Sequence, residues 1–231
     1  MARMSVEQRR TALIEAAYRV IADHGVEGAT TRRICSHANM PLASFHYAFD
    51  SRTSLLSAVM ETAVPSDIGR MLEAILPMTA DSEARGVEAM RKNMQAHLEA
   101  FYRLLKADPG RMQATISLGI YAHNHAELQA VGKQMYQRLY EVATIGLEVA
   151  AERSGVRWIE PTANLSPVII ATTNTITLTY LSTSDDVAIA KIIELMVTAL
   201  SAYLIEDCPN GDVEALPDRS VNDPAATTIN V

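Results

Sequence analysis

Apolar residues recur every three or four positions along most of this chain of 231 residues. In the first segment with this spacing they are Leu13, Ala16, Ala17, Val20 and Ile21. Residues spaced in this way lie on one face of an α-helix, because the helix turns once in about 3.6 residues. The pattern predicts a helix over residues 6–23, with Ser5 as its N-cap and Gly25 as its stop.

The same periodicity continues through the chain, so the expected fold class is all-α. Further helices are expected over residues 31–37, over a short segment opened by Pro41, from about Arg52 onward, and over residues 84–107, 112–121, 125–153, 162–183 and 185–206. Residues 154–161 are expected to form a loop. The stretch TTNTITLTY within residues 162–183 reads locally as a strand, because Thr is β-branched. A helix is favoured there, since the segment is long, its neighbours are helical and no partner strand is predicted.

The composition is that of a soluble globular protein, with 48% apolar and 20% charged residues. No apolar run approaches the roughly 18–20 residues that span a bilayer, and the N-terminal residues lack the apolar core of a signal peptide. A cytoplasmic protein without a membrane partner is therefore expected. The two cysteines, Cys35 and Cys208, fit a reducing compartment and have no metal-site spacing. Neither a metal nor another cofactor is predicted.

The charges are unevenly distributed, although the chain as a whole carries −7. Residues 1–60 contain 7 Arg against 5 Asp or Glu, a balance of +2, and residues 61–231 contain 13 Lys or Arg against 22 Asp or Glu, a balance of −9. This pattern indicates that a polyanionic partner would meet the N-terminal segment.

Residues 31–49 have the spacing of two short helices joined by a tight turn. The small residue Cys35 allows the two helices to cross closely. Four positions later, Asn39 is one of the few residue types other than Gly that tolerate a left-handed backbone. Phe45 and Phe49 are spaced to be buried beneath the second helix. A small residue, a turn residue and then a buried aromatic at these intervals are typical of a helix-turn-helix.

With these residues in place, the segment 10–60 resembles the N-terminal domain of the TetR family of transcriptional regulators. The matching positions are Gly25, Thr30-Thr31, Ile34-Cys35, Ala38-Asn39-Met40, Ala43-Ser44-Phe45-His46-Tyr47-Ala48-Phe49, Arg52 and Leu55-Leu56. Three positions depart from the family pattern: Asn39 replaces the usual Gly, Cys35 the usual Ala, and His46 a usual Tyr. The resemblance implies a three-helix DNA-binding domain over residues 1–52, a larger helical effector-binding and dimerisation domain over 53–207, and a flexible tail over 208–231.

The resemblance also implies which residues meet DNA. Pro41, Leu42 and Ala43 would face base edges in the major groove, and Ser44, His46, Tyr47 and Arg52 would contact phosphates, as would Thr31, Arg32 and Arg33 at the start of the preceding helix. The alternative for His46, Arg32 and Arg33 is that they are ordinary solvated side chains. An N-terminal arm with Arg3, Arg9 and Arg10 could also reach DNA, or could be a frayed terminus.

For the second domain, the resemblance implies an effector pocket and a dimer face. The candidate effector-binding residues are Met90, Met94, Phe101, Tyr102, Gln113, Tyr121, His123, Tyr136, Tyr140 and Asn174. Methionines suit an adaptable pocket, though they suit a core equally well. Trp158 either caps the pocket or simply packs. His123 and His125 cannot jointly face one metal ion from a helix, because residues two apart point to different sides.

The predicted hairpin over residues 162–206 is more apolar than an exposed surface should be. Its candidate dimer-interface residues are Ile169, Ile176, Ile189, Ile193, Met196, Val197, Leu200 and Leu204, and Leu178 and Leu181 belong to the same apolar surface. Two such hairpins would form a four-helix bundle. The alternative is that the hairpin is internal core.

The expected function is a dimeric regulator that binds a palindromic DNA operator, acts as a repressor and is released by a small apolar or aromatic effector. Activation is the alternative mode of control. The main rival functions are a helical enzyme and an adaptor that does not bind DNA. No Ser-His-Asp order, Gly-rich phosphate loop or HExxH motif supports an enzyme.

Overall fold

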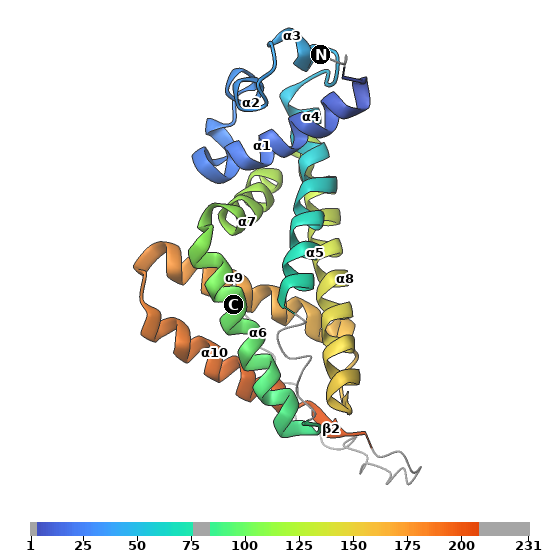
Figure 1. Cartoon of the computed structure of the whole chain (residues 1–231), viewed down its shortest axis with the longest axis vertical. Helices are drawn as coiled ribbons and strands as arrows, with labels where there is room; N and C mark the ends of the chain where they lie inside the picture. Colours follow the sequence, from blue (N-terminus) through green and yellow to red (C-terminus); the bar gives the residue numbers. More distant parts are fainter. Residues whose placement is uncertain (1–3, 76–83, 208–231) are drawn as a thin grey trace, which may run out of the picture.

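The computed structural model describes residues 4–75 and 84–207 (Figure 1). In chain order the helices are α1 (Val6–Gly28), α2 (Thr31–His37), α3 (Ala43–His46), α4 (Arg52–Ala58), the π-helical turn η1 (Val59–Ala63), α5 (Val64–Ile75), α6 (Val87–Ala107), α7 (Pro109–His123), the 3-10 turn η3 (Ala126–Leu128), α8 (Gln129–Ser154), α9 (Thr162–Thr183) and α10 (Asp186–Ser201). The all-α prediction is confirmed. No helix in the described ranges is long and apolar enough to span a membrane.

Helices α1 to α4 form a small head at one end of the molecule, above a longer body (Figure 1). Ser5 caps α1: its side chain accepts a hydrogen bond from the Gln8 amide, and the Gln8 side chain accepts one from the Ser5 amide. Gly25 does not end α1 as predicted. It has a φ of 71°, so the helix kinks there and continues to Gly28. Ser51 caps α4 in the same reciprocal way, with Ser54 as its partner.

The turn between α2 and α3 depends on the backbone of Asn39, whose φ is 53°. This left-handed residue reverses the chain, and the Met40 amide then donates to the Cys35 carbonyl at 2.8 Å. Beyond the turn, Phe45 and Phe49 are buried, with exposed fractions of 1% and 3%. The predicted helix-turn-helix is present. Its second helix is shorter than predicted, because α3 begins at Ala43 rather than at Pro41.

One helical rod connects the head to the body. Helix α4 passes without a break through η1 into α5, so the rod runs from Arg52 to Ile75. In the body α5 lies beside α8, and α1 of the head lies across α7 (Figure 1). Close approach of α1 and α7 requires Gly110, since a Cβ at that position would lie 2.6 Å from the Ala22 carbonyl oxygen.

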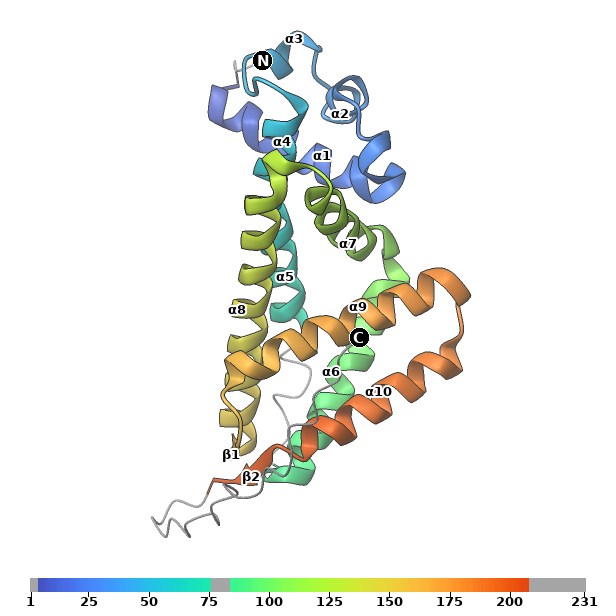
Figure 2. The ribbon, with the colours of Figure 1, turned by 180° about the vertical axis from the view of Figure 1, so that it is seen from behind.

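The described residues form two apolar cores. The first joins the buried faces of α1 to α4 to Ala114 and Leu118 of α7 and to Met135 and Leu139 of α8. Head and upper body therefore share one core. The second core lies lower, among α6, α9, α10 and the end of α8. Helix α9 crosses α8 and runs toward the α10 side of the molecule (Figure 2).

Two parts of the sequence prediction were wrong at the far end of the body. The expected loop over 154–161 contains a short strand, β1 (Val156–Trp158), which pairs antiparallel with β2 (Leu204–Glu206). Helix α10 therefore ends at Ser201, before the predicted residue 206. Each strand has only three residues, too few to show an alternating pattern. The apolar residues of β2 were therefore read as the last turn of a helix. The tail predicted over 208–231 lies outside the described residues.

The helical prediction for the Thr-rich segment is confirmed by α9. Its Thr hydroxyls donate to the backbone carbonyl of the preceding turn, as in Thr172 to Val168 at 2.8 Å and Thr177 to Thr173 at 2.7 Å. These bonds satisfy hydroxyls that would otherwise be buried without a partner, so β-branched residues are accommodated inside the helix.

The left-handed backbone of Asn39 gives a first test. Asn39→Val is expected to lower the free energy of unfolding by about 1–2 kcal/mol, because a branched side chain clashes with the backbone in this region. Asn39→Gly is expected to change it by less than about 0.5 kcal/mol, because Gly adopts positive φ without strain. Urea denaturation measures both. Equal destabilisation by the two substitutions would show that the Asn39 side chain, not its backbone angle, stabilises the turn.

Candidate nucleic-acid interface and ligand cavity

The outer face of α3 and the residues around it carry most of the predicted DNA contacts. Pro41, Leu42, Ala43, His46 and Tyr47 are exposed, and Ser44 is half-buried. Tyr47 stands out, because 73% of its surface is accessible although it follows the buried Phe45 by only two positions. A tyrosine so placed contributes nothing to the core. The exposed side chains here are apolar from Pro41 to Ala43, and His46 and Tyr47 add an imidazole and a hydroxyl.

Contacts with the core and with α1 hold the α3 face in place. Phe45 and Phe49 anchor it in the core, with ring centroids 5.9 Å apart. The Arg10 side chain of α1 donates to the Ala48 carbonyl at 3.0 Å, and its guanidinium lies 4.3 Å from the Phe49 ring centroid. Arg10 was one of the residues of the predicted DNA-binding arm, but it fixes the end of α3 instead. Arg3 lies outside the described residues.

The three residues of α2 that were predicted to contact phosphates differ in exposure and in hydrogen bonding. Arg32 is exposed, and Thr31 is half-buried. The Arg33 guanidinium is exposed but donates to the Gly28 carbonyl at 2.6 Å, so part of its hydrogen-bonding capacity is used within the head. The Thr30 hydroxyl accepts from the Arg33 amide at 3.3 Å and caps the helix. Of these side chains, Arg32 is the better placed to reach a phosphate.

Arg52 was predicted to contact a phosphate, and the structure places it elsewhere. Its half-buried guanidinium donates to the Val26 carbonyl, to the Ala29 carbonyl at 2.9 Å and to the Tyr121 hydroxyl at 3.1 Å. Three donors of Arg52 thus serve acceptors at the end of α1 and on α7. These contacts, named here the Arg52 clamp, fix the head to the body.

Tyr121 was predicted to line the effector pocket, but it belongs to the Arg52 clamp. Its ring centroid lies 5.6 Å from the Arg52 guanidinium carbon, and its other neighbour is His125, stacked at 3.8 Å. The pairing of residues 52 and 121 joins positions far apart in the sequence. No local pattern could have revealed it.

A second polar contact between head and body surrounds Asp67 of α5, a carboxylate with only 3% of its surface exposed. Arg111 of α7 and Arg70 donate to its Oδ1 atom, and the Tyr18 hydroxyl of α1 lies 3.2 Å from its Oδ2 atom. Burial and the adjacent carboxylate of Asp67 raise the pKa of Tyr18 well above its usual range, so the phenol stays protonated. The buried charge is satisfied by cations and a hydroxyl.

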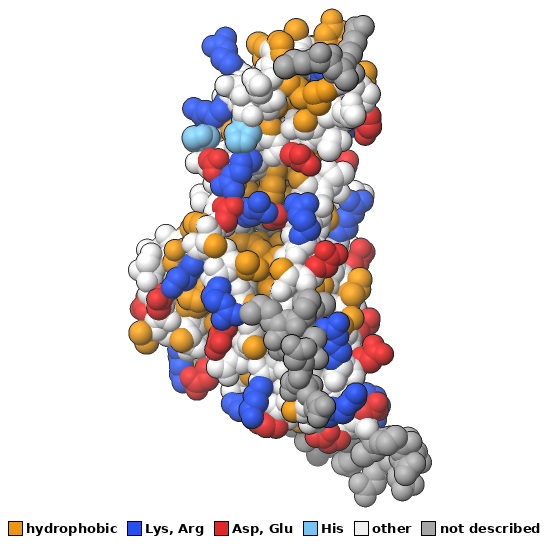
Figure 3. Space-filling view, viewed as in Figure 1, with side chains coloured by type: hydrophobic (Ala, Val, Ile, Leu, Met, Phe, Trp, Pro, Cys, Tyr) orange, Lys and Arg blue, Asp and Glu red, His pale blue; other side chains and the backbone are white. Residues whose placement is uncertain are grey.

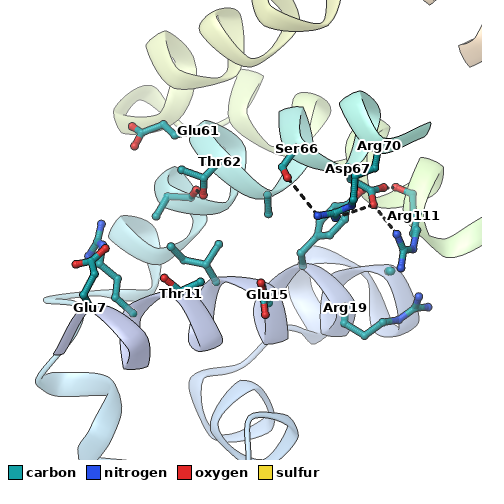
Figure 4. A pocket seen from close by; sticks show the side chains of 16 residues that line it. Glu7, Thr11, Glu15, Arg19, Glu61, Thr62, Ser66, Asp67, Arg70 and Arg111 are labelled. Atoms are coloured by element: carbon teal, nitrogen blue, oxygen red, sulfur yellow. Dashed lines mark hydrogen bonds and ion pairs between the residues drawn. The ribbon is translucent and has the colours of Figure 1, made fainter. Parts of the chain in front are cut away.

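A cleft of about 470 Å³ opens beside this contact, between α1 and the η1–α5 part of the rod. Asp67, Arg70 and Arg111 lie together at one end of the cleft, and Glu7, Thr11, Glu61 and Thr62 lie toward the other (Figure 4). Its walls carry both signs of charge. No pattern in the sequence pointed to this cleft.

A different, apolar cavity of about 160 Å³, partly open to the outside, lies in the body among α5, α6, α8 and α9. It is lined by Ile68, Met71, Leu72, Ile75, Met90, Met94, His97, Leu98, Phe101, Met112, Leu139, Val142, Ala143, Gly146, Leu147, Ala150, Ile169, Ile170, Thr173 and Leu200. On the outside of the molecule, hydrophobic side chains gather in the hollow between α5, α6 and α7 (Figure 3). The predicted effector residues Met90, Met94 and Phe101 all line this apolar cavity.

The other predicted effector residues do not line the apolar cavity. The Tyr102 hydroxyl donates to Asp186 on α10, and Gln113 and His123 are exposed. Tyr136, Tyr140 and Asn174 form a separate group: the two tyrosine rings are 6.3 Å apart, and Asn174 lies near the Tyr136 hydroxyl. The sequence could not separate such contacts from a pocket wall.

His97 is the titratable side chain in the cavity lining. Burial, together with the nearby Arg153 guanidinium, lowers the pKa of His97 below its ordinary value, so the imidazole is neutral at pH 7. Trp158 lies close by on β1, and its indole nitrogen donates to the carbonyl of Leu147, a lining residue, at 3.1 Å. The indole packs under the cavity wall and does not close a mouth.

The predicted dimer-interface residues need correction, because most of them lie in the core of the single chain. Ile176, Ile189, Ile193, Val197, Leu200 and Leu204 are buried, and Ile169 and Met196 are half-buried. The outward sides of the same helices carry other apolar residues, namely Val168, Leu178 and Leu181 on α9 and Val187 and Leu195 on α10. The residues predicted for the dimer face lie on the inward sides of the hairpin, since both sides are apolar and periodicity does not separate them.

No three His, Cys, Asp or Glu residues within 4–75 and 84–207 are close enough together to hold a metal ion. The His125 Nδ1 atom lies 2.7 Å from the Tyr121 carbonyl oxygen, so this ring belongs to the helix end and the Arg52 clamp.

The Arg52 clamp predicts a clear difference between two substitutions. Arg52→Met is expected to lower the free energy of unfolding by about 3 kcal/mol, because two half-buried carbonyls lose their charged donor. Tyr121→Phe removes one hydrogen bond and is expected to cost about 1 kcal/mol. Chemical denaturation measures both. If Arg52→Met kept full stability and only weakened binding to DNA, the phosphate contact predicted from the sequence would be correct instead.

Comparison with known proteins agrees with the geometry of the head. Residues 13–59 match the model of bacterial regulatory proteins of the TetR family. The HTH-type nicotine-responsive transcriptional repressor HdnoR of Paenarthrobacter nicotinovorans is 29% identical over 151 residues, which are 65% of this chain and 73% of that protein. Proteins of this family are DNA-binding regulators and not enzymes.

Solved structures share the fold over most of the chain. The multidrug binding protein EbrR complexed with ethidium superposes with a TM-score of 0.58 at 21% identity, over 83% of this chain and 97% of that one. Escherichia coli NemR in its reduced form gives 0.60 at 14% identity, over 86% and 98%. With the matched DNA-binding segment 13–59, the exposed face of α3 and the helical body, the chain is similar to transcriptional regulators of the TetR family.

Proposed function

We propose that the chain acts as a repressor: it binds a palindromic DNA operator as a homodimer and leaves it when a small molecule occupies the apolar cavity. The observation that carries the proposal is the exposed face of α3, with Tyr47 73% accessible above a buried Phe45. HdnoR, the relative described above, is named as a repressor that responds to a small molecule. EbrR holds ethidium in its crystals.

On DNA, α3 would enter the major groove with Leu42 and Ala43 toward the base edges. Both side chains are exposed and apolar, so they suit thymine methyl groups. Tyr47, His46, Ser44 and Arg32 carry donors that suit phosphates. Two heads of a dimer must lie about 34–36 Å apart to read successive turns of the same DNA face.

The dimer would form through the outward sides of α9 and α10. Val168, Leu178, Leu181, Val187 and Leu195 are exposed there, and Ala171 and Thr175 on α9 are small enough for close helix approach. Five large apolar side chains on one hairpin are more than a monomer surface needs, and pairing two hairpins removes them from water. A two-fold protein also matches a palindromic site.

Release would follow from the rod α4–η1–α5. Ile68, Met71, Leu72 and Ile75 of α5 line the cavity, and Arg52 at the other end of the same rod holds the head. A molecule that widens the cavity would displace α5, and the rod would carry the shift to the Arg52 clamp. The effector favours release only by its stronger affinity for the displaced conformation.

The DNA contact of Tyr47 is testable without disturbing the fold. Tyr47→Ala is expected to weaken operator binding about tenfold or more, because a hydrogen bond to a charged phosphate is lost. The thermal midpoint should stay within about 2 °C, since the side chain is exposed. The operator is first selected from a random DNA pool, and affinities are then measured by fluorescence anisotropy at one fixed salt concentration.

Two outcomes of that experiment would contradict the proposal. A pool that yields no preferred sequence, even at low salt, would argue against operator binding. A large fall in the thermal midpoint of Tyr47→Ala would show that Tyr47 supports the core.

The proposed dimer face can be tested by placing a negative charge on the outward side of α9 or α10. Leu178→Glu and Leu195→Glu are expected to convert the dimer to a monomer in light scattering, because a carboxylate opposite its symmetry mate opposes association. The control is Ile120→Glu, an exposed apolar position on α7 outside this hairpin. It should keep the dimer mass. A dimer that survives both hairpin substitutions would place the interface elsewhere.

A further inference from the structure

The apolar cavity has a composition that restricts what it can hold. Among the described residues that line it, none is Asp, Glu, Lys or Arg. Its polar side chains are His97 and Thr173, and the imidazole is neutral for the reason given above. The Thr173 hydroxyl donates to the Ile170 carbonyl at 2.9 Å, so toward the cavity it can only accept a hydrogen bond.

We propose that the effector is a neutral, largely apolar molecule about the size of one aromatic ring, and that permanent cations of the same shape are rejected. This inference rests on the proposed function only in naming the occupant as the effector. The selectivity itself is a property of the cavity.

The volume of the cavity limits the size of the ligand. The cavity measures about 160 Å³. An apolar cavity of about 150 Å³ made in another protein stays dry and binds benzene, so a volume of this size suits a single ring. Met71, Met90, Met94 and Met112 line the cavity, and methionine side chains change rotamer at low cost. They allow the shape of the ring and its substituents to vary.

The charge of the ligand is limited by the described part of the lining, which offers no acidic side chain to pair with a cation. A cation that enters this site loses part of its hydration and meets no carboxylate among the described lining residues. Phe101 is the aromatic ring of the lining, and its face offers only a weak attraction to a cation compared with the lost hydration. A neutral ring loses little hydration and gains contact with the apolar side chains of the lining. A hydroxyl or amine N–H on the ligand has the Thr173 oxygen as an acceptor.

The test compares toluene with N-methylpyridinium, which has the same shape and a permanent positive charge. Isothermal titration calorimetry on the full chain without DNA measures both. Toluene is expected to bind at least 100-fold more tightly than N-methylpyridinium. Equal affinities, tighter binding of the cation, or no binding of toluene would each overturn the inference.

A pair of variants on α8 tests whether toluene binds in the cavity. Ala143→Met adds a long side chain at a lining position, and Ala130→Met adds the same side chain at an exposed position of the same helix. Ala143→Met is expected to weaken toluene binding at least tenfold, and Ala130→Met to leave it unchanged. If both variants bind toluene like the parent chain, the site is wrong. Ala150→Met, also at the cavity wall, replaces Ala143→Met if circular dichroism shows that the latter is unfolded.

The proposed function is judged by a separate measurement, release from the selected operator. Toluene that binds without releasing operator supports the cavity inference and contradicts its role in repression. A charged molecule that releases operator, while toluene does not bind, contradicts the inference and leaves the proposed function standing.

Discussion

The Arg52 clamp is the interaction on which the arrangement of this protein depends. One guanidinium joins the end of α1, through the Val26 and Ala29 carbonyls, to Tyr121 on α7. Because Arg52 is the first residue of α4, the same side chain fixes the direction of the rod α4–η1–α5. The face of α3 is held in turn by Phe45, Phe49 and the core that α1 and α4 share.

The rod α4–η1–α5 connects the Arg52 clamp to the apolar cavity. Its far end forms part of the apolar cavity, and its middle carries Asp67, which Tyr18 and Arg111 hold against α1 and α7. The π-helical turn η1 lies between the clamp and Asp67, and such turns interrupt regular helix geometry, often at functional sites. The head is therefore tied to the body at two polar contacts along one helix, and a shift of that helix would act on both.

Local patterns in the sequence predicted the helices, the turn at Asn39, the buried Phe45 and Phe49 and the exposed Tyr47, because each depends on residues close together in the chain. Contacts between distant positions were beyond such patterns. Arg52 looked like a phosphate ligand and Tyr121 like a pocket residue, yet they bind each other. The α9–α10 hairpin is apolar on both sides, so periodicity could not separate its core face from its outer face. The strands β1 and β2 were missed because each exists only through its pairing with the other.

The most direct test of the account is the coupling between operator and effector in the parent chain and in Tyr121→Phe. Ligand affinity is measured by calorimetry with and without operator DNA, and the ratio of the two affinities gives the coupling. In the parent chain, we expect operator to weaken ligand binding at least tenfold. In Tyr121→Phe this factor should fall toward one, while the affinity for each partner alone changes little. An unchanged factor in Tyr121→Phe would show that the signal does not pass through the Arg52 clamp.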